Sequence, residues 1–313
     1  MPNGTATHRR LGTWRDGDAK RAILAFIDEV TTIGSAGFVP PAARIAVFDN
    51  DGTLWCEQPT YPQAFFVLER VRELAAADPE FARLPVVQAL AGGDLRAAMA
   101  GGLGPLTEVV TRAHAGLTAE EFGEAAAEWF GHAVHPRFGV GYGQLAYRPM
   151  LELLELLRSA GFRAFLVTGG GVEFVRAVSL DMYGIPPDDV VGSSVELEVQ
   201  RREGRMVLVR QTAIRGRPNE GEPKPVNIQA HIGVRPILAA GNSAGDREML
   251  EYASTGPRRS LSLVIDHDDA EREYAYGGAS LTDPGAEPIL DTAGRLGWTV
   301  VSMRRDWATV FGG

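Results

Sequence analysis

The chain has 313 residues, 45% of them hydrophobic and 23% charged, which is enough for one large globular domain and a smaller one. Its 31 Lys and Arg residues against 40 Asp and Glu give a net charge of −9, so nothing electrostatic drives it towards nucleic acid. Cys56 is the only cysteine, which excludes an internal disulfide and a thiolate zinc cluster and fits a reducing compartment.

Neither a signal peptide nor a membrane span is visible in the sequence. Residues 1–20 contain no apolar run that could form a signal-peptide core, and no later segment approaches membrane-spanning length. We therefore expect a cytoplasmic protein without membrane partners, provided that no leader has been removed from the native chain.

The first predicted elements are a helix and a buried strand. Asp18 is expected to cap a helix whose apolar stripe is Ala22, Ile23, Phe26, Ile27, Val30 and Ile33. The short apolar run "RIAVF", residues 44–48, then predicts a buried strand.

Three later runs also predict strands, at residues 162–167, 236–240 and 260–266. The strands at 44–48, 162–167 and 236–240 are each followed by a polar or glycine-rich turn and a helical pattern. Repeated strand, loop and helix units indicate a Rossmann-like α/β fold, with a mainly parallel sheet and helices on both faces. An alternating run at 195–200 and a second at 206–210, separated by Gly204, predict a hairpin.

Helical patterns dominate between the first two strands, notably at residues 61–77 and 119–132. We interpret residues 55–147 as an inserted helical cap domain and residues 1–54 and 148–313 as the α/β core domain. The glycine-rich stretch 139–143 is expected to be a flexible return to the core.

Chemically useful side chains follow the predicted strands, where ligands bind in open parallel sheets. Asp49 and Asp51 follow the first strand; one carboxylate could attack a substrate while the other handles a proton. A calcium loop is the alternative, but an EF-hand would need a third acid in place of Thr53 and would not follow a buried strand.

The second and third strands bring further candidates. Thr168, Gly169 and Gly170 precede a predicted helix near Val172, so a hydroxyl and open backbone amides could cradle an anion there. Lys224, ahead of another helical pattern, could reach the same anion. Asn242 and Asp246 follow the third strand.

Ser243 presents a competing hypothesis, because Gly241 to Gly245 matches the G-x-S-x-G nucleophile elbow of serine hydrolases. That class needs an acid and then a histidine on separate later loops. His267 is the only histidine after Ser243, and no further strand separates it from the available acids. We therefore favour an acidic loop over a serine nucleophile.

Taken in order, "DNDGTL" at 49–54, Thr168, Lys224 and "GNSAGD" at 241–246 resemble the four motifs of the haloacid dehalogenase-like hydrolase superfamily. Within it, the chain is most similar to the branch with a helical cap that includes phosphoserine phosphatase. One departure is that related phosphatases usually have Asp where Asn242 stands.

The resemblance implies an Mg²⁺-dependent phosphatase that acts on a small phosphorylated metabolite through an aspartyl-phosphate. Asp49 would be the nucleophile and Asp51 the acid and base, while Thr168, Gly169, Gly170 and Lys224 would bind phosphate. The metal ligands would come from Asp49, the Asp51 carbonyl and Asn242 or Asp246. Substrate contacts are expected from Glu57, Arg137 or Arg148, for each of which a surface ion pair is the alternative.

Two other functions stay open. A dehalogenase of the same superfamily would use the first aspartate without a metal and typically lacks the second, so Asp51 favours phosphate chemistry. A non-catalytic phosphate-binding or regulatory protein is the second alternative, and Asn242 is the residue that keeps it open.

Overall fold

A seven-stranded sheet forms the centre of the molecule. The computed structural model describes residues 11–94, 97–98, 103–280, 283 and 285–312, so the first ten residues of the predicted core lie outside the described residues. The strand order is β3-β2-β1-β6-β7-β8, with β9 also beside β7, and every pairing is parallel except β7 with β8. The strands are β1 (Ile45–Phe48), β2 (Arg163–Gly171), β3 (Val190–Ser193), β6 (Leu238–Gly241), β7 (Leu261–Asp268), β8 (Ala275–Tyr276) and β9 (Thr299–Ser302).

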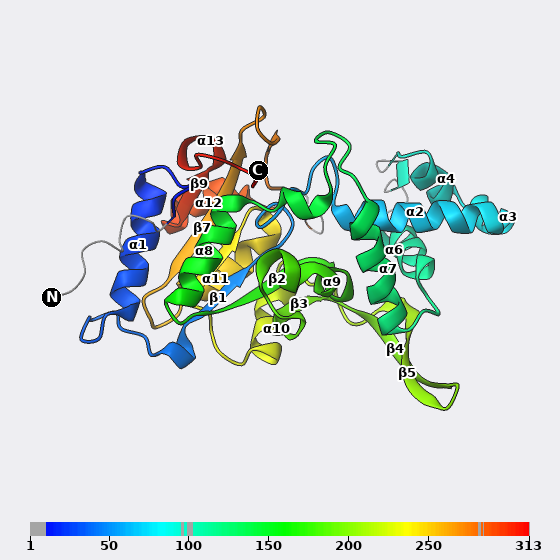
Figure 1. Ribbon diagram of the computed structural model, residues 1–313, viewed down its shortest axis with the longest axis horizontal. Helices are drawn as coiled ribbons and strands as arrows, with labels where there is room; N and C mark the ends of the chain where they lie inside the picture. The colour runs from blue at the N-terminus through cyan, green and yellow to red at the C-terminus, as the bar shows by residue number, and fades with distance from the viewer. Residues whose placement is uncertain (1–10, 95–96, 99–102, 281–282, 284, 313) are drawn as a thin grey trace.

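Helices cover both faces of this sheet, as the strand and helix pattern predicts (Figure 1). Ala46 and Phe48 of β1 pack in one hydrophobic cluster with α1 (Asp18–Thr31), α8 (Arg148–Ser159) and α9 (Val172–Tyr183). Ile45 and Val47 pack in a second cluster with α10 (Pro223–His231), α11 (Arg247–Ser254) and α12 (Ile289–Leu296). The strands are thus buried on both sides, which explains their continuous apolar runs.

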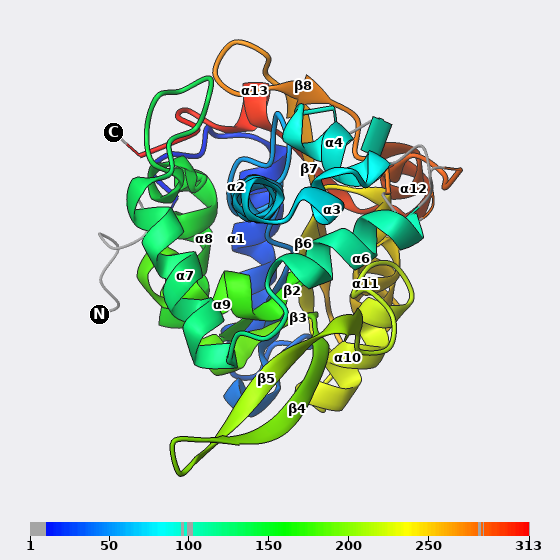
Figure 2. The same ribbon diagram turned by 90° about the vertical axis from the view of Figure 1, so that its right-hand side faces the viewer.

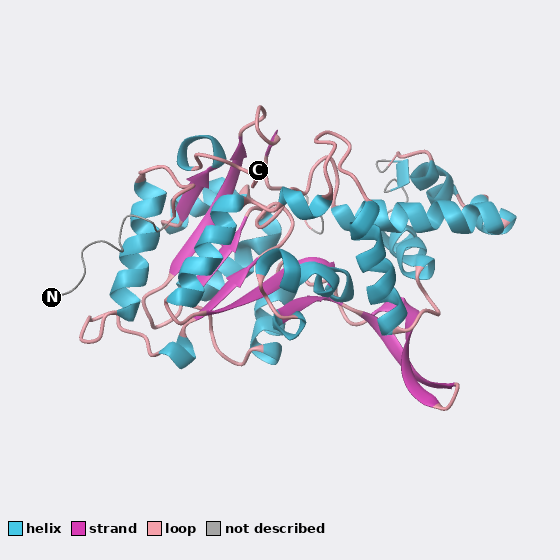
Figure 3. Cartoon of the chain, in the orientation of Figure 1, coloured by secondary structure: helices cyan, strands magenta, loops and turns pink. Residues whose placement is uncertain are grey.

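Only helices and loops occupy the described part of the segment between β1 and α8 (Figure 3). The helices are α2 (Pro62–Ala77), α3 (Pro79–Ala82), α4 (Pro85–Ala91), α6 (Leu103–Ala113) and α7 (Ala119–His132). α7 begins at a capping box, in which Thr118 accepts from the Glu121 amide and the Glu121 carboxylate accepts from the Thr118 amide. Aromatic packing joins these helices to the core, since the Phe66 and Phe174 rings lie 5.3 Å apart.

The predicted hairpin is confirmed as β4 (Val195–Arg202) and β5 (Arg205–Ile214), which pair antiparallel. It contacts α6 and α7 although it falls in the range predicted as core (Figure 2). Arg210 of β5 stacks 3.7 Å from the Phe122 ring centre and pairs with Glu173 of α9. The division into core at 1–54 and 148–313 and cap at 55–147 stays a prediction.

Some local expectations differ from the structure. The N-cap of α1 is Gly17, while Asp18 is the first helical residue and pairs with Arg21; Ile33 lies beyond the helix and is exposed. β2 continues through Gly171, so the three glycines are extended rather than a turn; their lack of side chains permits an irregular pairing with β3. None of the helices in the described part of the chain is both long and apolar enough to span a membrane.

Candidate active site

The ends of β1 and β6 lie side by side at the centre of the sheet. β1 pairs with β2 on one side and with β6 on the other. The strands that follow β1 in sequence therefore extend the sheet first in one direction (β2, β3) and then in the other (β6, β7). Such a switch point forms a crevice outside the carboxyl ends of the strands. The Asp49 amide donates to the Ala240 carbonyl at 2.9 Å, which fixes the two acidic loops against each other.

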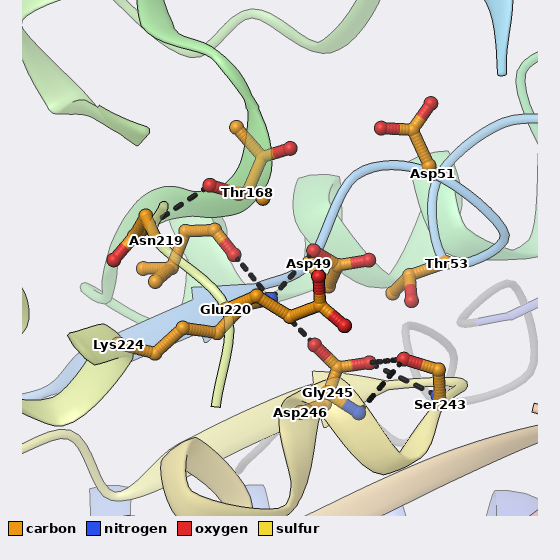
Figure 4. Close-up of polar contacts among 12 residues, drawn as sticks. Asp49, Asp51, Thr53, Thr168, Asn219, Glu220, Lys224, Ser243, Gly245 and Asp246 are labelled. Atoms are coloured by element: carbon orange, nitrogen blue, oxygen red, sulfur yellow. Dashed lines mark hydrogen bonds and ion pairs between the residues drawn. The ribbon is translucent and has the colours of Figure 1, made fainter. Parts of the chain in front are cut away.

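Lys224, at the start of α10, lies buried between two of the predicted acids (Figure 4). Its Nζ donates to Asp49 Oδ1 at 2.7 Å, to Asp246 Oδ1 at 2.5 Å and to the Val167 carbonyl at 2.9 Å. Burial opposes its charge, but the Asp246 and Asp49 carboxylates outweigh burial and raise the Lys224 pKa. Burial and repulsion from Asp246 raise the pKa of Asp49, although Lys224 partly offsets them.

Asp51 lies apart from this group, and its carboxylate points away from the other acids (Figure 4). Asp51 Oδ1 accepts from Trp55 Nε1 at 2.9 Å. Burial raises the pKa of Asp51 to about 6, against the opposing effect of the Trp55 hydrogen bond. A carboxyl with this pKa can carry or release a proton near neutrality.

Asn242 is held by polar contacts on both sides of its amide. Its Nδ2 donates to Glu57 Oε1 at 2.9 Å, and its Oδ1 accepts from Thr53 Oγ1 at 3.2 Å. Burial raises the pKa of Glu57 to about 7. Gly52 makes this packing possible, because its φ is +69° and a Cβ there would lie 2.0 Å from Asn242 Nδ2.

The Thr168 segment faces this group from β2. Thr168 Oγ1 accepts from the Gly170 amide at 2.9 Å, and the Thr168 carbonyl accepts from Asn219 Nδ2 at 3.0 Å. The next amide, that of Gly171, donates to Oε1 of Gln63 in α2 at 2.7 Å. This hydrogen bond connects the first turn of α2 directly to the glycine segment that is predicted to bind phosphate.

Ser243 has the surroundings of a helix cap rather than of a nucleophile. Its backbone is extended (φ −130°, ψ 165°), and its Oγ accepts from the Gly245 amide and contacts Asp246 Oδ2. His267 contacts the Gly52 carbonyl and Glu273 through its two ring nitrogens. The structure therefore supplies Ser243 with a structural role and does not bring His267 to it.

A cavity of about 660 Å³ opens over these strand ends. Its lining brings together most of the predicted site residues: Asp49, Asp51, Glu57, Gly169, Gly170, Lys224, Asn242 and Asp246. Thr168, Arg137 and Arg148 are not among the lining residues, and Thr168 is fully buried behind Gly169 and Gly170. Arg137 instead donates to the carbonyls of Ala270, Glu271 and Glu273, and Arg148 lies 3.9 Å from the carboxylates of Glu152 and Glu155.

The site fits a hard divalent cation with few protein ligands. Within the described ranges, no three His, Cys, Asp or Glu residues form a metal-binding group, so neutral oxygen donors would have to complete a site. Asp246 is already engaged, because its Oδ1 accepts from Lys224 and its Oδ2 from the amides of Asn242 and Ser243. Of the described cavity residues, Lys224 is the one buried base beside Asp49, Asp51 and Asp246. This excess of negative charge suits Mg²⁺, which takes oxygen ligands and keeps several waters.

Several residues of the site were missed by sequence reasoning. Trp55 binds Asp51, Gln63 binds the glycine strand, and Asn219 binds Thr168. Two of them could have been suggested by their closeness in sequence to predicted site residues: Trp55 stands four residues after Asp51, and Asn219 lies in a polar loop just before Lys224.

The sequence model of the haloacid dehalogenase-like hydrolase family matches residues 46–251, a span that includes both acidic loops and Lys224. The fold and the site thus define a Rossmann-like α/β protein with an inserted helical segment and an acidic site at its strand ends. The chain belongs to the haloacid dehalogenase-like hydrolase family.

Solved structures with a similar fold include a conserved functionally unknown protein from Anaerococcus prevotii DSM 20548. It is 16% identical, with a TM-score of 0.55, over 90% of this chain and 91% of that one. A protein of unknown function from Bordetella pertussis Tohama I is 17% identical, with a TM-score of 0.49, over 82% of this chain and 97% of that one. A phosphoserine phosphohydrolase-like protein from Francisella tularensis subsp. tularensis SCHU S4 is 14% identical, with a TM-score of 0.38, over 72% of this chain and 89% of that one. At these identities the first likeness supports the fold alone, and comparison with curated proteins gave no match.

Proposed function

We propose that this protein is a phosphatase that hydrolyses small phosphate monoesters, with Asp49 as the nucleophile. The observation that carries the proposal is the placement of Lys224 between Asp49 and Asp246 at the base of the cavity. A buried cation beside a carboxylate nucleophile would draw in a phosphoryl group and offset its charge.

The covalent steps can be assigned to residues of the chain. Asp49, with one oxygen held by Lys224, attacks phosphorus through the other; the bond to the ester oxygen breaks, and Asp51 gives that oxygen its proton. Asp51 then takes a proton from a water that attacks the aspartyl-phosphate, which releases phosphate and restores Asp49. A pKa of about 6 suits Asp51 to both steps.

The Thr168 hydroxyl, the Gly169 amide and the Lys224 ammonium would bind the phosphoryl oxygens, and the Gly170 amide would join them by exchanging its bond to Thr168 Oγ1 for one to the phosphate. Asp49, the Asp51 carbonyl and the Asn242 amide oxygen would hold Mg²⁺, whose chemistry is to neutralise charge on the phosphoryl oxygens. We assign Asp246 to positioning Lys224, because both of its oxygens are already engaged.

The test is phosphate release from a panel of monoesters, with Mg²⁺ or with a chelator. We expect Mg²⁺-dependent turnover that falls at least about 1,000-fold in Asp49→Asn and persists in Ser243→Ala. Unchanged turnover in Asp49→Asn would exclude Asp49 as nucleophile. Ester binding without turnover by the wild type would instead favour a phosphate-binding protein.

A further inference from the structure

The walls of the cavity differ sharply from its base. The base carries the carboxylates and Lys224, whereas the walls away from it carry aliphatic side chains from α2, α4, α6 and β5: Val67, Leu68, Leu90, Leu106, Val110 and Ile214. One continuous cavity therefore joins a charged end to an apolar end.

Two of the polar side chains among the lining residues bond to the protein itself. Thr111 Oγ1 donates to the Thr212 carbonyl at 2.6 Å, and Gln63 Oε1 accepts from the Gly171 amide. These bonds join α6 to β5 and α2 to β2.

Basic side chains are also scarce on the walls. Among the described lining residues, the bases are Lys224, bound to two carboxylates, and Arg217. The Arg217 side chain is 71% exposed and lies 3.3 Å from Glu222. A carboxylate or second phosphate on the substrate would thus enter an acidic cavity without a buried cation of its own.

We propose that the leaving group of the substrate is a compact apolar alcohol, aromatic or branched aliphatic, rather than an amino acid or a sugar acid. The inference rests on the proposed phosphatase function and specifies its substrate class. The phosphoryl group binds at the charged base, and the apolar body displaces water from the aliphatic walls. Cavities of this size bind small molecules mainly through such walls, with a few polar groups that fix orientation.

The first experiment compares kcat/KM for four monoesters of primary alcohols: benzyl and 3-methylbutyl phosphate against phosphoserine and glycerol phosphate. We expect the two apolar esters to be preferred by about 10-fold or more, the discrimination that small apolar groups give in a matched pocket. Equal or better turnover of phosphoserine or glycerol phosphate would overturn the inference and leave the phosphatase function standing.

Variants locate the preference in the walls. Val110→Thr keeps the side-chain shape and replaces a methyl group by a hydroxyl, and Ile214→Thr adds a second hydroxyl on a side chain one carbon shorter. We expect kcat/KM for benzyl phosphate to fall about 10-fold in the double variant and that for glycerol phosphate to change little. The matched control is Val199→Thr on β4, where the residue is 61% exposed and outside the cavity. An equal loss for both esters, or no loss, would contradict the assignment.

Binding separates the two proposals if no ester is turned over. The Kd of benzylphosphonate and of 2-amino-3-phosphonopropionate, the phosphonate counterpart of phosphoserine, is measured by calorimetry with Mg²⁺. Tighter binding of benzylphosphonate by about 10-fold would support the apolar site even though catalysis had failed. Equal or reversed affinities would reject it.

Discussion

The ammonium group of Lys224 donates to Asp49 Oδ1 at 2.7 Å, and both side chains are buried at the base of the cavity. Lys224→Met would leave Asp49 and Asp246 buried without a cation. We expect the free energy of unfolding of the metal-free protein to fall by about 3 kcal/mol at pH 8, as when one partner of a buried ion pair is removed. Urea unfolding measures the change, and the loss should shrink at pH 5, where the carboxyls can take up protons. A loss that is equal at both pH values would show that Lys224 acts through packing.

Asp49→Asn should separate activity from stability. Burial and Asp246 both raise the Asp49 pKa, so the ionised carboxylate is a cost to the folded protein in the absence of metal. We expect the variant to lose turnover and to gain about 1 kcal/mol in free energy of unfolding at pH 8 with chelator. A clear loss of stability would mean that the Asp49 to Lys224 bond outweighs this cost.

Asn242→Asp tests why an amide stands in this loop. The substitution would set a second carboxylate against Glu57 in place of the 2.9 Å hydrogen bond. We expect the metal-free protein to lose about 2 kcal/mol of stability at pH 8. Adding Glu57→Gln should recover most of the loss, because the Gln amide can donate to the new carboxylate. Additive effects of the two substitutions would indicate that the side chains do not interact.

Glu57→Gln should change how stability depends on pH. The Glu57 pKa is raised from 4.5 to about 7, so the folded protein binds a proton there that the unfolded chain releases at lower pH. That contribution is fully present below pH 4.5 and is lost as the pH rises through about 7, a change of about 3 kcal/mol. With chelator present, the difference in free energy of unfolding between wild type and Glu57→Gln should therefore decline from pH 4 to pH 8. A difference that does not vary with pH would contradict the raised pKa.

Ser243→Ala should lower stability and spare catalysis. The Ser243 hydroxyl accepts from the Gly245 amide at the start of a short helical turn, and loss of such a cap costs about 1 kcal/mol. We expect a lower Tm and a kcat within a few-fold of wild type in phosphate release. Ser243→Thr, which keeps the hydroxyl, serves as the control for stability. Abolished turnover in a folded Ser243→Ala protein would restore the serine-nucleophile hypothesis.

The strand ends could be predicted from sequence because buried parallel strands are short, apolar and followed by polar residues. That pattern placed Asp49, Thr168 and Asn242 at one edge of the sheet, and the structure brings them to one region. Strands β3 (VVGS) and β9 (TVVS) were missed because each has only two apolar residues in a row, whereas the equally short β1 (IAVF) and β6 (LAAG) form longer apolar runs.

Side-chain contacts between residues that are far apart in the chain could not be predicted from the sequence. Asp246 was expected as a possible metal ligand, yet its engagement by Lys224 and two backbone amides depends on how α10 meets β6. Arg137 and Arg148, which lie on either side of the glycine-rich stretch 139–143, were expected to contact the substrate. Arg137 instead meets the carbonyls of residues 270–273, more than 130 positions away.

Because of the hairpin β4–β5, the wall of the cavity is built from two parts of the chain that are far apart in sequence. The cavity wall comes partly from lining residues between Thr60 and Thr111 and partly from Ile214 and Arg217, about a hundred positions further on. The hairpin turn at Glu203 and Gly204 lies at the opposite end of β5 from Ile214, the lining residue of that strand, so its length can vary without disturbing Asp49 or Lys224. Substitutions in the hairpin can therefore reshape the pocket during evolution while the catalytic loops stay fixed.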